Sequence, residues 1–210
     1  MDKTHKPEEA LDMTLAQPVQ PLSPEQYYRL ERAAQTKSDY YRGEVFAMGG
    51  GTIRHSLICM NLGAGLHTRL AASPCTAYES NLRLKIKATG LRTYPDVSVY
   101  CDPPEPDEED ASGETLTNPT VLFEVLSKST EAYDRGFKAR NYRQIASLRG
   151  YLLIAQEEPR VEAYQRQGDG PWVLSEADGM ESVVMIESIR ITMPLAEIYA
   201  RVDFGERGTT

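Results

Sequence analysis

Two acidic residues in otherwise apolar segments are the first candidates for chemistry in this chain. Glu124 lies in the run PTVLFEVLS (119–127), and if that run is a strand, Glu124 shares a face with two leucines. A carboxylate in such a place is costly unless it is paired, protonated or bound to a cation. Asp96 follows Pro95, which cannot donate to a sheet ladder, so a strand begins or bulges there. Two strands that each carry one acid can bring both carboxylates together, and such a pair suits Mg²⁺.

Each of these acids also has an ordinary structural interpretation. Glu124 could reach solvent at a strand end or pair with an arginine, and Asp96 could bond its own backbone in a turn. Lys138 lies four residues after Asp134, so the two share a helix face. They form a surface ion pair, or Lys138 leans over the carboxylates and orients an attacking water.

A helix, a hairpin and a second helix are predicted for the N-terminal part. Residues 23–26 (SPEQ) supply a serine N-cap, a proline at the first helical position and a capping-box glutamine, and this helix is expected to run to about 37. Residues 40–48 form a strand, or a hairpin that turns at Gly43. Thr52 caps a helix to about residue 70. The residues of this helix expected to face the core are Ile53, Leu57, Met60 and Ala64.

Strands dominate the rest of the chain, with two helices among them. Strands are predicted at 75–78, 82–87, 94–101, 119–127, 150–156, 161–166, 172–177 and 182–186, and helices at 127–147 and 194–200. The run 119–127 is apolar enough for a strand covered on both faces. This order predicts an α/β (α+β) domain built on one mixed sheet flanked by helices, with a C-terminal β-hairpin region.

The domain is predicted to span residues 23–204, between a flexible tail at 1–22 and a short C-terminal tail at 205–210. Inside it, residues 102–118 contain seven acidic residues and no lysine or arginine, which predicts a solvated acidic loop.

Composition excludes several classes of protein. The 210 residues contain no apolar run near the roughly 18 needed to cross a bilayer, and no secretory signal at the start. Cys59, Cys75 and Cys101 are odd in number and widely spaced, which argues against a disulfide framework and a zinc site and favours a cytoplasmic location. The net charge of −8 argues against coating of DNA or membranes by bulk charge, but it permits an enzyme with a local site.

The chain resembles the bacterial family of restriction-endonuclease-like proteins in the PD-(D/E)XK phosphodiesterase superfamily. The resemblance covers roughly residues 22–204. It is carried by ordered blocks: SPEQYYRLERA (23–33), YYRGEVFAMGGGTIRHSLICMNL (40–62), TYPDVSVYC (93–101), FEVLSKSTEAYDRGFKARNYRQIASLRGYLLI (123–154) and PRVEAYQRQ (159–167). The resemblance implies a mixed β-sheet core flanked by helices and metal-dependent cleavage of phosphodiester bonds in nucleic acid.

The resemblance also implies roles for individual residues. Asp96 matches the aspartate of the Pro-Asp motif, and Glu124 matches the acid of the next motif. The superfamily has a lysine two positions later, where this chain has Leu126, and Lys138 on the following helix fits as its replacement. Glu44 resembles an additional metal or water ligand, unless it is simply an exposed strand residue.

The sequence therefore predicts an endonuclease that uses Mg²⁺ or Mn²⁺, acts on nucleic acid, with DNA as the expected substrate, and has no membrane partner. Its metal ligands would be Asp96, Glu124 and Glu44, with Lys138 beside the water. Substrate contacts are expected from His55, Arg140 and Arg143, although His55 also suits a packing or capping role. The resemblance also suggests a homodimer, because superfamily members often pair. The alternative is an inactive or partner-dependent nuclease-fold protein that binds nucleic acid or has a regulatory role. The leucine at position 126, where the superfamily has a lysine, favours this alternative.

Overall fold

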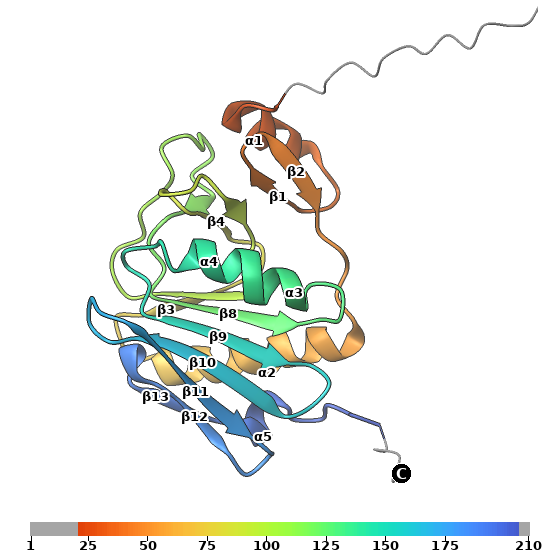
Figure 1. Ribbon diagram of the computed structural model, residues 1–210, viewed down its shortest axis with the longest axis vertical. Coiled ribbons are helices and arrows are strands. Elements are labelled where there is room, and N and C mark those ends of the chain that lie inside the picture. The colour runs from red at the N-terminus through yellow and green to blue at the C-terminus, as the bar shows by residue number, and fades with distance from the viewer. Residues whose placement is uncertain (1–20, 206–210) are drawn as a thin grey trace, which may run out of the picture.

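The computed structural model describes residues 21–205, and its centre is a six-stranded mixed sheet (Figure 1). In order across the sheet, the strands are β11 (Trp172–Asp178), β10 (Arg160–Arg166), β9 (Gly150–Ala155), β8 (Val121–Leu126), β6 (Val97–Tyr100) and β3 (Thr76–Glu79). The central pair β8 and β9 is parallel, and the other neighbouring pairs are antiparallel. The predicted mixed sheet flanked by helices is confirmed.

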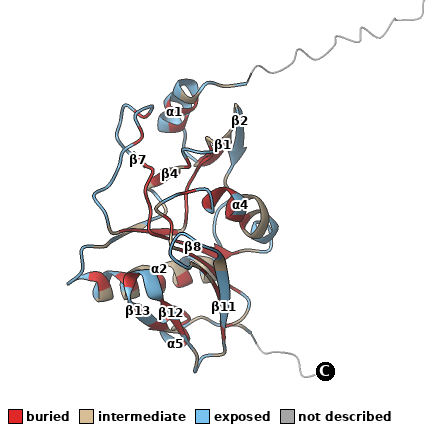
Figure 2. Cartoon of the chain, turned by 60° about the vertical axis from the view of Figure 1, so that its left-hand side comes forward, coloured by how far each residue is buried: buried red, intermediate tan, exposed pale blue. Residues whose placement is uncertain are grey.

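Helices cover both faces of this sheet (Figure 1). One layer contains α2 (Ile53–Leu70), β12 (Val183–Ile186), the 3₁₀ turn η2 (Glu187–Ile189), β13 (Ile191–Pro194) and α5 (Leu195–Ile198). The other contains α3 (Glu131–Tyr133), the π-helical turn η1 (Asp134–Lys138) and α4 (Ala139–Tyr142). Alternate residues of β8 belong to the two cores, so this strand is buried on both sides, as its apolar run predicts (Figure 2).

A second, five-stranded sheet lies beside the first. In order, its strands are β2 (Glu44–Ala47), β1 (Ser38–Tyr41), β5 (Arg92–Thr93), β4 (Arg83–Lys85) and β7 (Thr115–Leu116). Helix α1 (Pro24–Ala33) contributes Tyr27 and Tyr28 to a small core with Tyr40 of β1. The prediction of one sheet was wrong because strands of two to four residues are too short to show a clear alternation.

Helices α1 and α2 begin where predicted, but α1 ends at Ala33, before the predicted residue 37, and β1 starts at Ser38, before the predicted residue 40. The Ser23 hydroxyl accepts from the Gln26 N–H at 3.2 Å, and the Gln26 side chain accepts from the Ser23 N–H at 2.7 Å, which completes the capping box. Gly43, at φ +91°, makes the turn between β1 and β2. Leu22, predicted as part of the tail, donates to the Gly43 carbonyl at 3.0 Å. The rest of the N-terminal tail, 1–20, and residues 206–210 lie outside the described residues.

Helix α2 buries a different face from the predicted one. Ile53 and Met60 are 92% and 70% exposed. The buried residues are Ile58, Leu62, Leu66 and Leu70, which follow one another at intervals of four. Both stripes are apolar, so periodicity identified the helix but not the side that faces the sheet.

The segment 103–118 docks against the small sheet, contrary to the predicted solvated loop. Asp107 and Asp110 are 5% and 4% exposed. Asp107 accepts from the Lys85 ammonium at 2.7 Å, and Asp110 pairs with Arg83 at 3.2 Å. These acids neutralise basic residues of the small sheet, so much of the negative charge of the loop is compensated inside the fold.

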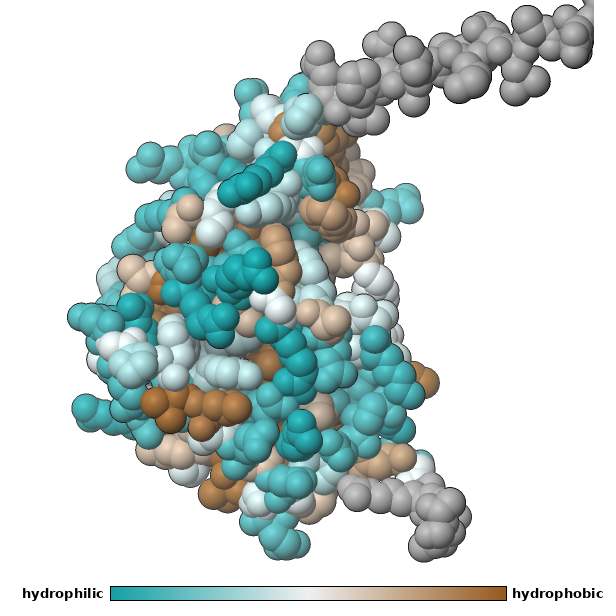
Figure 3. All heavy atoms as spheres, viewed as in Figure 1, coloured by the Kyte–Doolittle hydropathy of each residue, from teal (hydrophilic) through white to brown (hydrophobic). Residues whose placement is uncertain are grey.

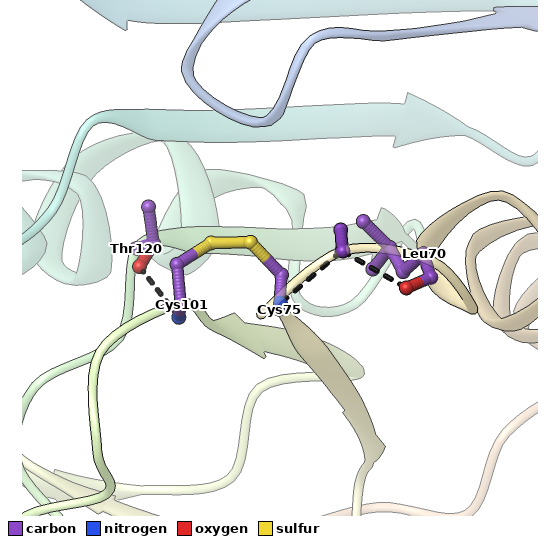
Figure 4. Close-up of a disulfide and its surroundings, with 5 residues drawn as sticks. Leu70, Cys75, Cys101 and Thr120 are labelled. Atoms are coloured by element: carbon purple, nitrogen blue, oxygen red, sulfur yellow. Dashed lines mark hydrogen bonds between the residues drawn. A yellow bond between two sulfur atoms is a disulfide. The ribbon is translucent and has the colours of Figure 1, made fainter.

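Cys75 and Cys101 form a disulfide, whereas the sequence predicted unpaired cysteines (Figure 4). The two residues continue the β3–β6 ladder, in which Thr76 faces Tyr100. The register of the antiparallel strands brings them together, and the spacing of cysteines along the chain does not reveal it. The cysteine-based argument for a reducing compartment therefore loses its support.

The visible surface is mainly polar. In Figure 3, hydrophilic residues cover most of the face shown, and apolar residues form separate groups. Among residues 21–205, no helix is long and apolar enough to cross a membrane.

Acid is expected to weaken the contact between the acidic segment and the small sheet. Burial acts to raise the pKa of Asp107, but hydrogen bonds from Lys85, Tyr28 and the Glu109 N–H, together with the charge of Lys85, outweigh it and hold the pKa below 3.8. The pKa of Asp110 is also held below 3.8, since hydrogen bonds from Thr115 and Ser112 outweigh burial. A lowered native pKa stabilises the fold above the unfolded value, and this stabilisation is lost as the pH falls through the native pKa.

The substitution Asp107→Asn should lower the free energy of unfolding at pH 7 by about 1.5–3 kcal/mol, the range for hydrogen bonds to charged groups. The difference from the wild type should shrink below about pH 4. Urea unfolding between pH 7 and pH 3 measures both effects. The exposed neighbour supplies the control, since Glu108→Gln should change little. A wild type and an Asp107→Asn variant with parallel pH profiles would contradict this account.

The disulfide is expected to stabilise the fold by closing a chain segment with a sequence separation of 26. The chain-entropy relation gives about 3–4 kcal/mol for a loop of this length. The paired substitution Cys75→Ser with Cys101→Ser should therefore lower the urea midpoint markedly, and reductant should lower that of the wild type. The Cys59→Ser variant should still respond to reductant. Indifference of the wild type to reductant would show that the disulfide contributes nothing to stability.

Candidate functional site

Four sequence-predicted residues meet in one cavity between the two sheets. The cavity has a volume of about 460 Å³, and its lining includes Asp96, Glu124, Lys138 and His55. The strand register explains the convergence. Val97 of β6 pairs with Phe123 of β8, so Asp96 and Glu124, each one residue away, are neighbours across the ladder.

Glu124 is buried, with 2% of its surface exposed, and it is paired with a lysine. Its Oε1 accepts from the Lys138 ammonium at 3.0 Å and from the Tyr142 hydroxyl at 2.7 Å. Burial raises the pKa of Glu124 to about 8, and repulsion by Asp134 and Asp96 adds to the rise while Lys138 opposes it. The protonation state of the Glu124 carboxylate therefore depends on the charged groups around it.

The π-helical turn η1 carries Lys138 to this carboxylate. The Ala139 N–H reaches the carbonyl of Asp134, five residues earlier, and π-turns of this kind often mark functional sites. The Lys138 ammonium also lies 3.3 Å from Oδ1 of Asp134, as an ion pair without hydrogen-bond geometry. Burial lowers the pKa of Lys138, but the attractions of Glu124, Tyr142, Asp134 and Asp39 together outweigh it, so the net shift is upward. Lys138 is therefore charged at neutral pH.

His55 lies against Asp96 at the start of α2. The Thr52 side chain caps the helix by accepting from the His55 N–H at 3.0 Å. The His55 ring then places Nε2 3.3 Å from Oδ2 of Asp96, and the Val125 N–H donates to the same oxygen at 2.7 Å. The hydrogen bond with Asp96 raises the pKa of His55, and burial opposes it. These contacts hold one oxygen of Asp96 in place.

Asp39 is the acidic residue of the cavity that the sequence did not single out. It lies on β1 of the small sheet and is 4% exposed. Its Oδ2 accepts from the Tyr133 hydroxyl at 3.0 Å, and its buried Oδ1 has no hydrogen-bond partner among residues 21–205. In the sequence, Asp39 stands directly before two tyrosines at the start of the hairpin. This position alone does not indicate which face of β1 is buried.

The structure does not bring three other predicted residues to the cavity lining. Glu44 lies on β2, only five residues from Asp39, but it is exposed. Arg140 and Arg143 lie on and just after α4, and both are exposed. The neighbours of Glu44 do reach the cavity, since Phe46, Ala47 and Met48 form part of its wall.

Carboxylates outnumber cationic groups in the described cavity lining. Its ionisable residues other than tyrosine are Asp39, Asp96, Glu124, Asp134, Lys138 and His55. Hydrogen bonds to Asp96 and Glu124 converge on Oδ2 and Oε1, and Oδ1 of Asp39 is unpaired within the described part of the chain. Carboxylate oxygens are the ligands that Mg²⁺ and Mn²⁺ prefer. The donor set thus fits a hard divalent cation.

Comparison with known proteins places this chain in a family. Residues 24–195 match the model of the Uma2 family, described as "Putative restriction endonuclease". The chain belongs to the Uma2 family. The predicted restriction-endonuclease-like relationship is thereby confirmed.

Two relatives of this Uma2 protein come from Synechocystis sp. The "Uncharacterized protein slr1290" is 35% identical over 187 residues, which cover 89% of this chain and 96% of the relative. The "Uncharacterized protein sll1609" is 34% identical over 170 residues, which cover 81% of this chain and 95% of the relative.

A solved structure has the same fold as this Uma2 protein. It is a "putative nuclease belonging to DUF820" from Anabaena variabilis, and the superposition has a TM-score of 0.67 at 18% identity. The match covers 85% of this chain and 98% of that chain. The shared fold therefore extends over most of this chain.

The unpaired oxygen of Asp39 yields a stability prediction for the metal-free Uma2 protein. Asp39→Asn removes one of several like charges from a buried site, so it should raise the free energy of unfolding by about 1 kcal/mol. Urea unfolding in the presence of a chelator measures the change. Glu44→Gln, at an exposed position of the same hairpin, should have no effect. A destabilised Asp39→Asn variant would mean that the charge is compensated in the fold.

Proposed function

We propose that this Uma2 protein is a metal-dependent endonuclease that hydrolyses phosphodiester bonds in DNA, with Mg²⁺ or Mn²⁺ as its cofactor. The observation that carries the proposal is the convergence of Asp39, Asp96 and Glu124 on one cavity beside the charged Lys138. A site with surplus carboxylates and one fixed ammonium suits a reaction in which a cation meets a phosphate.

The metal ligands in this proposal are Asp96, Glu124 and Asp39. Asp39 takes the assisting role that the sequence suggested for Glu44, because Asp39 lines the cavity and Glu44 does not. Bound there, a divalent cation would polarise the phosphate and lower the pKa of a coordinated water. His55 and the Val125 N–H keep the Asp96 carboxylate in position.

Lys138 acts as a fixed positive charge in this proposal. Its raised pKa keeps the ammonium protonated, so it donates hydrogen bonds and does not accept a proton from water. It holds the attacking water in position and offsets the negative charge that develops on the phosphoryl group. Tyr142 restrains the Glu124 carboxylate between itself and Lys138. The lysine missing at position 126 is thus replaced in space, although not in sequence.

The cavity wall offers a surface for the rest of a nucleotide. Phe46 is 45% exposed, and it lines the cavity together with Met48 and residues 49–51. An exposed aromatic ring at this position can stack on a base, which is a sequence-tolerant contact. Arg140 and Arg143, outside the cavity, are proposed to contact backbone phosphates of a longer substrate. The proposal also includes a homodimer, in which two sites face the two strands of DNA. It further includes a cytoplasmic location.

The direct test is cleavage of plasmid and single-stranded DNA in Mg²⁺ or Mn²⁺. Asp96→Asn, Glu124→Gln and Asp39→Asn should each abolish cleavage, and Lys138→Met should lower the rate by about 10²–10³-fold, as for other fixed donors that stabilise developing charge. Glu44→Gln is the matched control and should retain full activity. Circular dichroism shows whether each variant is folded.

Two results would overturn the proposal. Cleavage that survives Asp96→Asn or Glu124→Gln would exclude this cavity as the site. A folded wild type that binds neither Mg²⁺ nor Mn²⁺ in calorimetry and cuts no DNA would instead favour the inactive or partner-dependent nuclease-fold protein.

A further inference from the structure

Three metal ligands of different chemical type meet beside the proposed catalytic cavity. Cys59 lies one turn after His55 on α2, and its Sγ is 3.5 Å from Nδ1 of His55. The other ring nitrogen of His55 is 3.3 Å from Asp96. One imidazole nitrogen, one thiol sulfur and one carboxylate oxygen all lie within 4.8 Å of one another. Cys59 takes no part in the function proposed above.

We propose that His55, Cys59 and Asp96 form a second metal site, which takes a thiophilic divalent cation of the Zn²⁺ class. This site was not predicted from the sequence, because the spacing of the cysteines argues against zinc. The site shares Asp96 with the hard-cation site, so occupation by Zn²⁺ would withdraw one carboxylate from Mg²⁺. That consequence rests on the proposed function, whereas binding at the site does not.

The three donor atoms lie near the spacing that a tetrahedral ion needs. Zinc bonds of about 2.0–2.3 Å place tetrahedral ligand atoms roughly 3.3–3.8 Å apart. One atom each from His55, Cys59 and Asp96 lie within 4.8 Å of one another, so small side-chain rotations would bring them to bonding distance. Cys59 and Asp96 contact opposite nitrogens of the ring, so a single ion would bind one of these nitrogens and replace the present contacts. The fourth position can be filled by water from the adjoining cavity.

Residues at i and i+4 on one helix are a common source of two ligands, because they lie on the same face. Here His55 and Cys59 have that spacing on α2, and the capping by Thr52 fixes the first turn of the helix. The third ligand comes from the main sheet, where the Val125 N–H holds Asp96 in place. The three ligands are therefore supplied by rigid elements.

Ligand chemistry separates the two sites by metal class. Thiolate and imidazole favour Zn²⁺, whereas Mg²⁺ prefers an all-oxygen environment. Burial raises the pKa of the Cys59 thiol well above its usual range, so the sulfur is protonated in the metal-free protein. Metal binding replaces that proton, which passes to solvent as the metal–sulfur bond forms. Cys59 is the one free thiol, since Cys75 and Cys101 are joined to each other.

Cobalt provides a spectroscopic test that does not depend on cleavage. Co²⁺ added to the full-length, non-reduced protein should give tetrahedral visible bands and a near-ultraviolet thiolate-to-cobalt charge-transfer band. Zn²⁺ should abolish these bands by displacing Co²⁺, in keeping with the order of affinities. Mg²⁺ at the same concentration should leave them unchanged.

Matched variants decide whether Cys59 and His55 are the ligands. Cys59→Ser and His55→Gln should each remove the charge-transfer band or weaken Co²⁺ binding at least tenfold, the loss that removal of even an outer-shell partner causes. His67→Gln, an exposed histidine later in the same helix, should behave as the wild type. No band in the wild type overturns the proposal. A band that persists in Cys59→Ser also overturns it, because the thiolate would then come from Cys75 or Cys101.

A competition assay tests the link to the hard-cation site. If the protein cleaves DNA, low Zn²⁺ should inhibit the Mg²⁺-dependent reaction of the wild type, and Cys59→Ser should require at least about tenfold more Zn²⁺ for the same inhibition. Equal inhibition of the wild type and Cys59→Ser would show that Zn²⁺ does not inhibit through the thiophilic site. A protein that shows the cobalt band but no cleavage would retain the thiophilic site and lose the proposed function.

Discussion

A buried carboxylate in the middle of an apolar strand is the constraint on which this structure depends. Glu124 sits among leucines on β8 with 2% of its surface exposed, and an isolated charge there would be strongly disfavoured. The Lys138 ammonium and the Tyr142 hydroxyl donate hydrogen bonds to one of its oxygens and so compensate for the burial. Both come from the segment that follows β8, which must therefore turn back over the sheet and take up the π-helical turn.

The opposite side of the cavity depends on a different interaction. The small sheet has strands of two to four residues, too few to be held by a ladder alone. Tyrosine packing and ion pairs between the acidic segment and β4 and β5, several of them buried, hold it together. This layer carries Asp39, so a carboxylate of the site depends on acids that are more than sixty residues away in sequence.

The sequence was most informative where one residue conflicts with its surroundings. Glu124 in an apolar run and Asp96 after Pro95 were found in this way, and the pairing of β6 with β8 brings them together. Asp39 was missed because an acid in a polar-looking hairpin shows no such conflict until the other sheet covers it. The docked acidic segment and the Cys75–Cys101 pair were missed for a related reason, since both depend on partners that only the tertiary fold supplies. The buried face of α2 was predicted wrongly because this helix has two apolar stripes, and only one of them packs against the sheet.

The spread of the site along the chain has a consequence for biosynthesis. Asp39, Asp96, Glu124 and Lys138 enter the growing polypeptide in that order, and the ammonium comes last. Until η1 and α4 have been made, Glu124 lacks its hydrogen-bond partners Lys138 and Tyr142, and a carboxylate without them is disfavoured in the interior as an ion. The parallel partner of β8 follows later still, as β9. We therefore expect a nascent chain to hold separated carboxylates and no assembled centre, so that a hydrolase of this design stays inert on the ribosome until about three quarters of its sequence has been translated.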